Sequence, residues 1–310
     1  MWDVHVHLIP PDVVDAAERG HFGLRREGEW IVLDGERVPA EGRMIDFEGI
    51  DRYARQYGTS LILSVPPALL RKGRDPLWAS FANDALASVK RSMTCEAEML
   101  AILPFDDSEA AIREWDRVLP VCVGITVGGS IGARRLSNPR NARLWESIAA
   151  RGGLALVHGG ETHDSRLSDY YLANLVGYPY EDTVATADLV FSGLPLKHPS
   201  IQWCVSHGGG AAPFLLSRWQ RGYETRRPGI DVTAPPPTAV YRELWFDSVV
   251  HDSRALQFLM EGAPDRVVFG TDYPFPMGTF WHLEENVLPE VMLKTLTANG
   301  DRLMECVRKG

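Results

Sequence analysis

Short apolar runs rich in β-branched residues recur along the chain, and amphipathic segments of helical length separate them. This alternation is typical of repeated strand–helix units around a parallel sheet. Eight runs are predicted as strands: Trp2 to His7, Ser60 to Val65, Met99 to Leu103, Val121 to Val127, Leu154 to His158, Ile201 to Ser206, Leu244 to Val249 and Arg266 to Gly270. Eight units in one chain predict an α/β fold of the (β/α)8 TIM-barrel type.

One region departs from this alternation, between the first and second predicted strands. The apolar run 30–33 is followed by Asp34-Gly35, a pair that favours a tight hairpin turn. Residues 20–45 are therefore predicted as a small inserted β hairpin. Since 310 residues also suit one α/β barrel, we expect residues 1–310 to form a single domain.

Composition narrows the class of protein. Lys and Arg total 32 against 41 Asp and Glu, a net charge of −9, which argues against a nucleic-acid partner. No run approaches the ~20 apolar residues of a membrane span. The four cysteines contain no CxxC pair, so neither a disulfide framework nor a thiolate zinc site is predicted. We expect a cytoplasmic protein that does not bind membranes.

The first predicted strand carries two histidines, His5 and His7. Because side chains alternate along a strand, both imidazoles are expected on one face, with Val4 and Val6 on the other. In a barrel the histidine face would be the interior, where two imidazoles can bind one metal ion.

Three later predicted strands also carry side chains that can bind a metal at their carboxyl ends. They are His158 at the end of the fifth strand, His207 after the sixth and Asp272 after the eighth. Functional groups of barrel enzymes collect at the carboxyl ends of strands, so these side chains are expected to meet the first two histidines. Three imidazoles and a carboxylate suit Zn²⁺ or a similar divalent ion.

We predict that His5, His7, His158 and Asp272 bind the metal and that His207 is the general acid/base. The roles of His158 and His207 could be exchanged, because spacing does not separate a ligand from a base.

Longer motifs surround these residues. They are His5-Val6-His7, Leu156-Val157-His158, Ser206-His207-Gly208-Gly209-Gly210 and Gly270-Thr271-Asp272-Tyr273-Pro274-Phe275-Pro276. Together they resemble the amidohydrolase superfamily and, within it, the α-amino-β-carboxymuconate-ε-semialdehyde decarboxylases. The resemblance implies one zinc ion held by the four predicted ligands, with His207 matching the histidine that activates water. The run Val121 to Val127 lacks the lysine of dinuclear members, which also favours one ion.

The resemblance also implies how substrate is held. Arg218 matches an arginine that reaches the neighbouring subunit's active site and binds a substrate carboxylate, which implies at least a homodimer. Arg43 is expected to correspond to a second carboxylate-binding arginine. After His158 these decarboxylases have proline and tryptophan, whereas this chain has Gly159-Gly160-Glu161, so a different substrate is expected.

The leading hypothesis is non-oxidative decarboxylation of a small unsaturated or aromatic carboxylic acid. His207, Asp272 or water would protonate the carbon that loses CO₂. The alternative is hydrolysis of an amide or lactone with the same zinc and water. The sequence leaves both reactions open.

Overall fold

The computed structural model describes residues 1–33, 36–70, 75–131, 134–160, 164–279 and 288–309. Within these ranges, seven parallel strands form one sheet in the order β1-β5-β6-β7-β8-β9-β10. Their bounds are β1 Trp2–His7, β5 Ser60–Ser64, β6 Ala97–Ala101, β7 Gly124–Gly128, β8 Gly153–His158, β9 Ile201–Val205 and β10 Trp245–Phe246. The first seven predicted strands all have a counterpart here.

The eighth predicted strand is irregular backbone that contacts both edges of this sheet. On one side, the N–H groups of Phe246 and Val268 donate to Arg266 and Phe246 at 2.8 Å. On the other side, the Val4 N–H donates to the Phe269 carbonyl at 3.0 Å, and the Asp272 N–H donates to the His5 carbonyl at 2.9 Å. Residues 266–272 therefore bridge β10 and β1, and the curled sheet is barrel-like.

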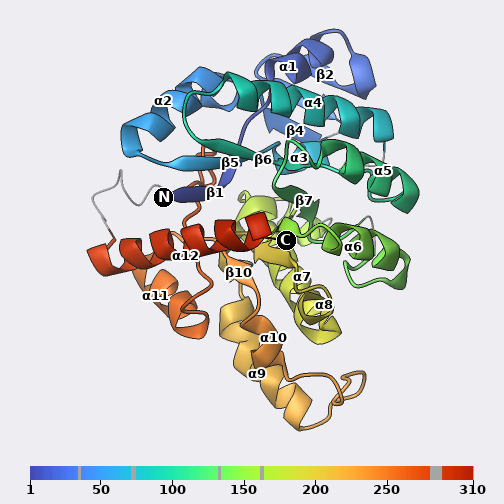
Figure 1. Cartoon of the computed structure of the whole chain (residues 1–310), viewed down its shortest axis with the longest axis vertical. Coiled ribbons are helices and arrows are strands. Elements are labelled where there is room, and N and C mark those ends of the chain that lie inside the picture. The colour runs from blue at the N-terminus through green and yellow to red at the C-terminus, as the bar shows by residue number, and fades with distance from the viewer. Residues whose placement is uncertain (34–35, 71–74, 132–133, 161–163, 280–287, 310) are drawn as a thin grey trace.

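Helices follow the strands and cover the outside of the sheet (Figure 1). They are α1 Pro11–Glu18, α2 Phe47–Tyr57, α3 Pro67–Leu70, α4 Pro76–Ser92, α5 Ser108–Val118, α6 Ala142–Ala149, α7 Tyr178–Ser192, α8 Leu194–Lys197, α9 Ala212–Glu224, α10 Pro237–Tyr241, α11 Ser253–Gly262 and α12 Glu290–Lys309. In α5, Ala111, Trp115 and Val118 form the buried stripe, and Asp107 caps the first turn by accepting from the Glu109 and Ala110 N–H groups. None of the described helices has the length and apolar composition needed to cross a membrane.

The valines beside the two histidines do not share a face. Val6 packs in the large cluster between strands and helices, whereas Val4 packs with Ile62 and with Leu303 of α12. The prediction that Val4 and Val6 lie together is wrong because the pairing of β1 with β5 shifts between Asp3 and Val6. Such a bulge adds a residue and breaks strict alternation along the strand.

Residues 20–45 contain a small antiparallel sheet. Its strands are β2 Arg25–Glu27, β3 Trp30–Leu33 and β4 Glu36–Pro39, so there is one strand more than in a hairpin. Ile31 and Leu33 pack in a second cluster with Val13 of α1 and Trp78 of α4. The predicted turn at Asp34-Gly35 lies outside the described residues.

Candidate metal centre

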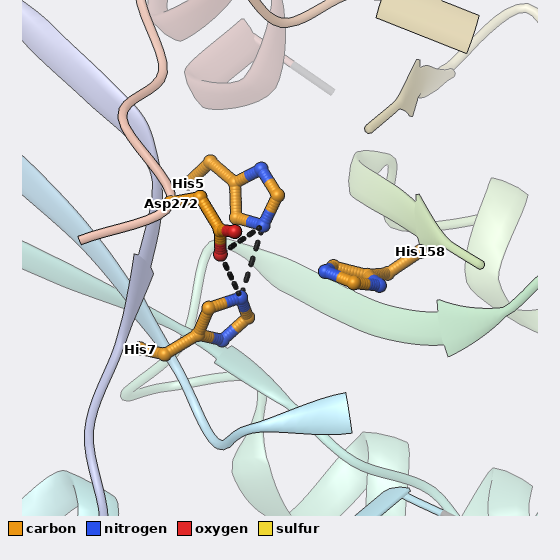
Figure 2. Close-up of side chains that lie close together, drawn as sticks. All are labelled: His5, His7, His158 and Asp272. Atoms are coloured by element: carbon orange, nitrogen blue, oxygen red, sulfur yellow. Dashed lines mark hydrogen bonds and ion pairs between the residues drawn. The ribbon is translucent and has the colours of Figure 1, made fainter. Parts of the chain in front are cut away.

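Four of the predicted residues meet at one point. His5 and His7 lie on β1, His158 is the last residue of β8, and Asp272 follows the segment that bridges the sheet edges. Each offers one ligand atom, and these atoms lie within 4.8 Å of one another. Figure 2 shows His158 facing the other three side chains from across the site. All four residues are buried, although they come from distant parts of the sequence.

The distances among the ligand atoms match a small ion. The Nε2 atoms of His5 and His7 are 2.9 Å apart, and Oδ1 of Asp272 lies 3.3 and 3.2 Å from them. Tetrahedral bonds of 2.0–2.1 Å place two zinc ligands about 3.3 Å apart. The spacing of these three atoms is therefore close to that expected around one divalent ion.

Hydrogen bonds fix which ring nitrogen of two histidines carries the proton. Nδ1 of His158 lies 2.6 Å from the Gly159 carbonyl, and Nδ1 of His7 lies 3.2 Å from the Val65 carbonyl. A carbonyl only accepts, so each Nδ1 carries the hydrogen and each Nε2 has a free lone pair. Burial and the neighbouring imidazoles lower the pKa of His158 well below its ordinary value, which keeps this lone pair available.

The third imidazole is held by Asp247, which follows β10. Its Oδ2 lies 2.5 Å from Nδ1 of His5, and both side chains are fully buried. Its Oδ1 accepts from the N–H groups of Gly208 and Val249 at 2.9 and 3.1 Å. Asp247 therefore orients His5 so that its Nε2 faces the other ligand atoms.

These contacts test whether a metal ion fits. Nε2 of His158 and Oδ1 of Asp272 are buried and have no hydrogen-bond partner among the described residues. Two imidazole lone pairs facing each other at 2.9 Å repel unless a cation lies between them. Burial raises the pKa of Asp272, but His5 and His7 lower it to below its ordinary value, so a carboxylate completes the set. The four residues fit a divalent ion.

His207 lies beside this set but is not one of the four grouped residues. Its Nδ1 is 2.7 Å from Oδ2 of Asp182, and its Nε2 is 4.0 Å from Oδ2 of Asp272. Burial lowers the pKa of His207, but the Asp182 carboxylate raises it, to about 9. His207 also has a positive φ of 49°, a conformation that ordinary residues rarely adopt and that is common at functional sites.

A cavity of about 410 Å³ opens onto the site. His207 and Asp272 lie on its wall, and much of the remaining lining is apolar, including Tyr178, Val249 and Phe258. The cavity can therefore hold a small, largely apolar molecule next to His207 and Asp272.

The two predicted arginines lie on the surface. Arg218 is exposed on α9, and Arg43 is exposed in a short 3-10 turn, Gly42–Met44. Neither is among the described residues that line the cavity. Within this single chain, neither arginine lies with the four converging residues. The segment after His158 was predicted to differ from the decarboxylases at Gly159-Gly160-Glu161, and Glu161 lies outside the described residues.

Two buried carboxylates were missed by sequence reasoning. Asp247 ends an apolar run, Leu244 to Phe246, and a charged residue there was a usable signal. Asp182 lies in the first half of α7, where an acidic residue is ordinary for a helix and gives no signal.

Comparisons with known proteins show the family to which the chain belongs. The model of the amidohydrolase family matches residues 2–302. The chain is 29% identical over 300 residues to 2-amino-3-carboxymuconate-6-semialdehyde decarboxylase of Dictyostelium discoideum, covering 89% of this chain and 82% of the relative. Among solved structures, 5-carboxyvanillate decarboxylase of Sphingomonas paucimobilis superposes with a TM-score of 0.79 at 22% identity, covering 98% of both chains.

A second solved structure with a similar fold contains a metal ion. Dihydroxybenzoic acid decarboxylase of Polaromonas sp. JS666, with bound manganese and the inhibitor 2-nitroresorcinol, has a TM-score of 0.76 at 20% identity over 98% of this chain and 96% of its own. The likeness in fold covers nearly the whole of each chain, and the family model spans the four converging ligands. This chain belongs to the amidohydrolase family.

Proposed function

We propose that this protein is a metal-dependent, non-oxidative decarboxylase of a small aromatic or unsaturated carboxylic acid. The observation that carries the proposal is the convergence of His5, His7, His158 and Asp272 beside an imidazole outside this set, His207, at the wall of an apolar cavity. The decarboxylase relatives favour this reaction over hydrolysis of an amide or lactone.

Zn²⁺ is the first candidate for the ion, with Mn²⁺ the second because a structural neighbour contains manganese. When bound, the ion supplies a Lewis acid that orients and polarises a substrate carboxylate or its neighbouring oxygen. His5, His7, His158 and Asp272 hold it, one ion per chain. Three imidazole nitrogens suit Zn²⁺, and the carboxylate oxygen is a ligand that suits Mn²⁺ as well.

The chain's own residues orient the substrate and move the proton. The apolar side chains of Tyr178, Val249 and Phe258 pack against its ring and exclude water from the reacting carbon. The bond to the carboxyl carbon breaks, its electron pair stays on the ring carbon, and CO₂ leaves. His207 then gives a proton to that carbon and regains one from solvent, with water the alternative donor, so no oxidant or reductant is needed.

A homodimer completes the site in this proposal. Helix α9 extends away from the sheet (Figure 1), and its Arg218 is exposed and free to reach a second copy. Phe214 on the same helix is 80% exposed and lines the cavity, so a second copy packed against α9 would lie next to the substrate. Arg218 from the partner, and Arg43, would bind a carboxylate or oxygen of the substrate.

The test is reconstitution. Metal-free protein is loaded with Zn²⁺ or Mn²⁺ and incubated with carboxylates that include the relatives' substrates, 5-carboxyvanillate and 2-amino-3-carboxymuconate 6-semialdehyde, with CO₂ as the readout. A parallel panel of amides and lactones is followed by acid release. CO₂ from at least one acid, lost on metal removal, supports the proposal. Hydrolysis without any CO₂ would establish the alternative.

Sedimentation of the loaded protein tests the homodimer separately. A dimer whose Arg218→Ala variant keeps its mass but binds substrate more weakly supports the role of that arginine. A monomer with full activity would exclude it.

A further inference from the structure

Asp182 is a buried carboxylate that the metal set does not use. It lies on α7, is completely buried, and directs Oδ2 at Nδ1 of His207 over 2.7 Å. A buried carboxylate needs donors to offset the loss of water. The described residues around Asp182 offer three such donors, and one of them is the ring of His207.

The other two donors hold Asp182 in place. Its Oδ1 accepts from the Gly159 N–H at 2.6 Å and from the Ser206 hydroxyl at 3.0 Å. Gly159 follows β8 and Ser206 follows β9, so one side chain joins two strand ends. The next residue of α7, Thr183, accepts through its hydroxyl oxygen from the Ala211 N–H at 2.8 Å. This bond also holds α7 against the segment that follows His207.

This arrangement determines which nitrogen of His207 carries a proton. A carboxylate only accepts, so Nδ1 of His207 must donate to Asp182. The Ser206 oxygen, 3.1 Å from the same Nδ1, has its hydrogen directed at Asp182 and can also accept from the ring. Nε2 is then the nitrogen that faces Asp272 and the cavity, and it is the one able to exchange a proton with substrate.

We propose that Asp182 is a positioning residue for His207: it keeps the proton on Nδ1 and the ring turned so that Nε2 faces the reacting carbon. The inference rests on the proposed function for the role of His207, but the hydrogen-bonding state of the ring can be measured without any turnover. It adds a carboxylate–imidazole pair to the site beside the metal ligands.

Asp182→Asn is the most direct variant. The Gly159 N–H only donates, so the single oxygen of the Asn side chain stays on it and the amide NH₂ faces His207. Nδ1 must then accept and loses its hydrogen, so the ring can no longer carry hydrogens on both nitrogens, the form in which Nε2 gives a proton to the substrate carbon. We expect kcat to fall about 10²–10⁴-fold, because a positioned general acid or base typically raises the rate by this factor. KM and metal content are expected to stay within twofold.

A matched control lies on the same helix. Asp188 is also buried, and its carboxylate accepts from the N–H and hydroxyl of Ser137 rather than from a histidine. Asp188→Asn removes a buried negative charge from α7 and is expected to leave kcat within twofold. An equal loss of kcat in both variants would mean that Asp182 only stabilises the helix, and would overturn the proposal.

A double variant separates positioning from general damage. If Asp182 acts through His207, adding Asp182→Asn to His207→Ala leaves the residual kcat of His207→Ala unchanged. A further loss of the same size as in the single variant would overturn the proposal.

Nitrogen NMR tests the pair directly in the zinc-loaded wild-type protein. The His207 signals are identified by their absence from the His207→Ala spectrum. A protonated Nδ1 in wild type, and an unprotonated one in Asp182→Asn, is the expected result. An unprotonated Nδ1 in wild type would refute the inference whatever reaction the protein catalyses, whereas a protein that releases no CO₂ but keeps this hydrogen would refute the proposed function alone.

Discussion

Asp247 offers the sharpest test of the metal centre, through the variant Asp247→Asn. In the wild type its Oδ1 accepts from two backbone N–H groups, those of Gly208 and Val249, and its Oδ2 accepts from Nδ1 of His5. Both backbone groups only donate, so the Asn oxygen is expected to stay with them and its NH₂ to face His5. Nδ1 must then accept, which moves the ring proton to Nε2, the atom that faces the metal ligands.

The size of the effect follows from this change. Removing a partner that orients a metal-binding imidazole typically weakens metal binding about 10–100-fold, or about 1.4–2.8 kcal/mol. The lost contact is a charge-assisted hydrogen bond, and such bonds contribute about 1.5–3 kcal/mol. The two figures agree, so we expect a loss of about 2 kcal/mol in the free energy of metal binding by Asp247→Asn.

Competition with a chromophoric chelator measures this affinity for Zn²⁺ and for Mn²⁺. Thermal unfolding gives a second readout, because the stabilisation by a fixed concentration of free metal falls by about 1.4 kcal/mol for each tenfold loss of affinity. Asp188→Asn is the control for loss of a buried carboxylate, and its metal affinity is expected to match the wild type. A folded Asp247→Asn protein with wild-type affinity would refute the reasoning.

Three further predictions concern stability and substrate binding. Asp51 accepts from the Thr94 hydroxyl and from the Thr94 and Cys95 N–H groups, and although burial raises its pKa, these hydrogen bonds lower it from 3.8 to about 2. Its contribution of about 2 kcal/mol to the free energy of unfolding is therefore present above about pH 4 and lost as the pH falls toward 2, which acid titration of wild type and Asp51→Asn measures. In Gly124→Ala the new Cβ would lie 1.9 Å from the Leu154 carbonyl oxygen, so we expect a loss of about 3 kcal/mol in urea unfolding. Arg218→Ala is expected to raise KM about 10–100-fold with little change in kcat.

Each of these has an outcome that contradicts it. If Asp51→Asn and wild type lose stability in parallel between pH 4 and 2, the carboxylate does not carry the predicted pH dependence. Wild-type stability in Gly124→Ala would mean that β7 and β8 can separate there at little cost. An Arg218→Ala enzyme with unchanged KM would leave the arginine without a role in binding.

Much of the site could be predicted from the sequence because strand ends are local features. The run 153–158 is apolar up to its last residue, so His158 had to stand at the end of a strand, and the same argument places His207. Parallel strands present their carboxyl ends at one edge, and therefore residues far apart in the sequence could be predicted to meet. Periodicity and topology bring His5, His7, His158, His207 and Asp272 to one edge, but they do not decide whether His158 or His207 joins the other three, and the structure groups His158 with them.

Two features of the fold depend on how adjacent strands pack, and only the tertiary structure decided them. The shift in pairing at Asp3 separates Val4 from Val6, and the last segment bridges both sheet edges without forming a regular strand. Periodicity carries no signal for either feature, because both arise from how adjacent strands match in register.

The partners of the imidazoles were likewise decided by the tertiary structure. Asp247 reaches His5 across 242 positions of sequence, and Asp182 reaches His207 from a helix. A sequence shows which residues can bind a metal or move a proton. Which ring nitrogen is free to do so depends on a hydrogen bond at the opposite side of the ring, and that bond exists only once distant segments have packed together.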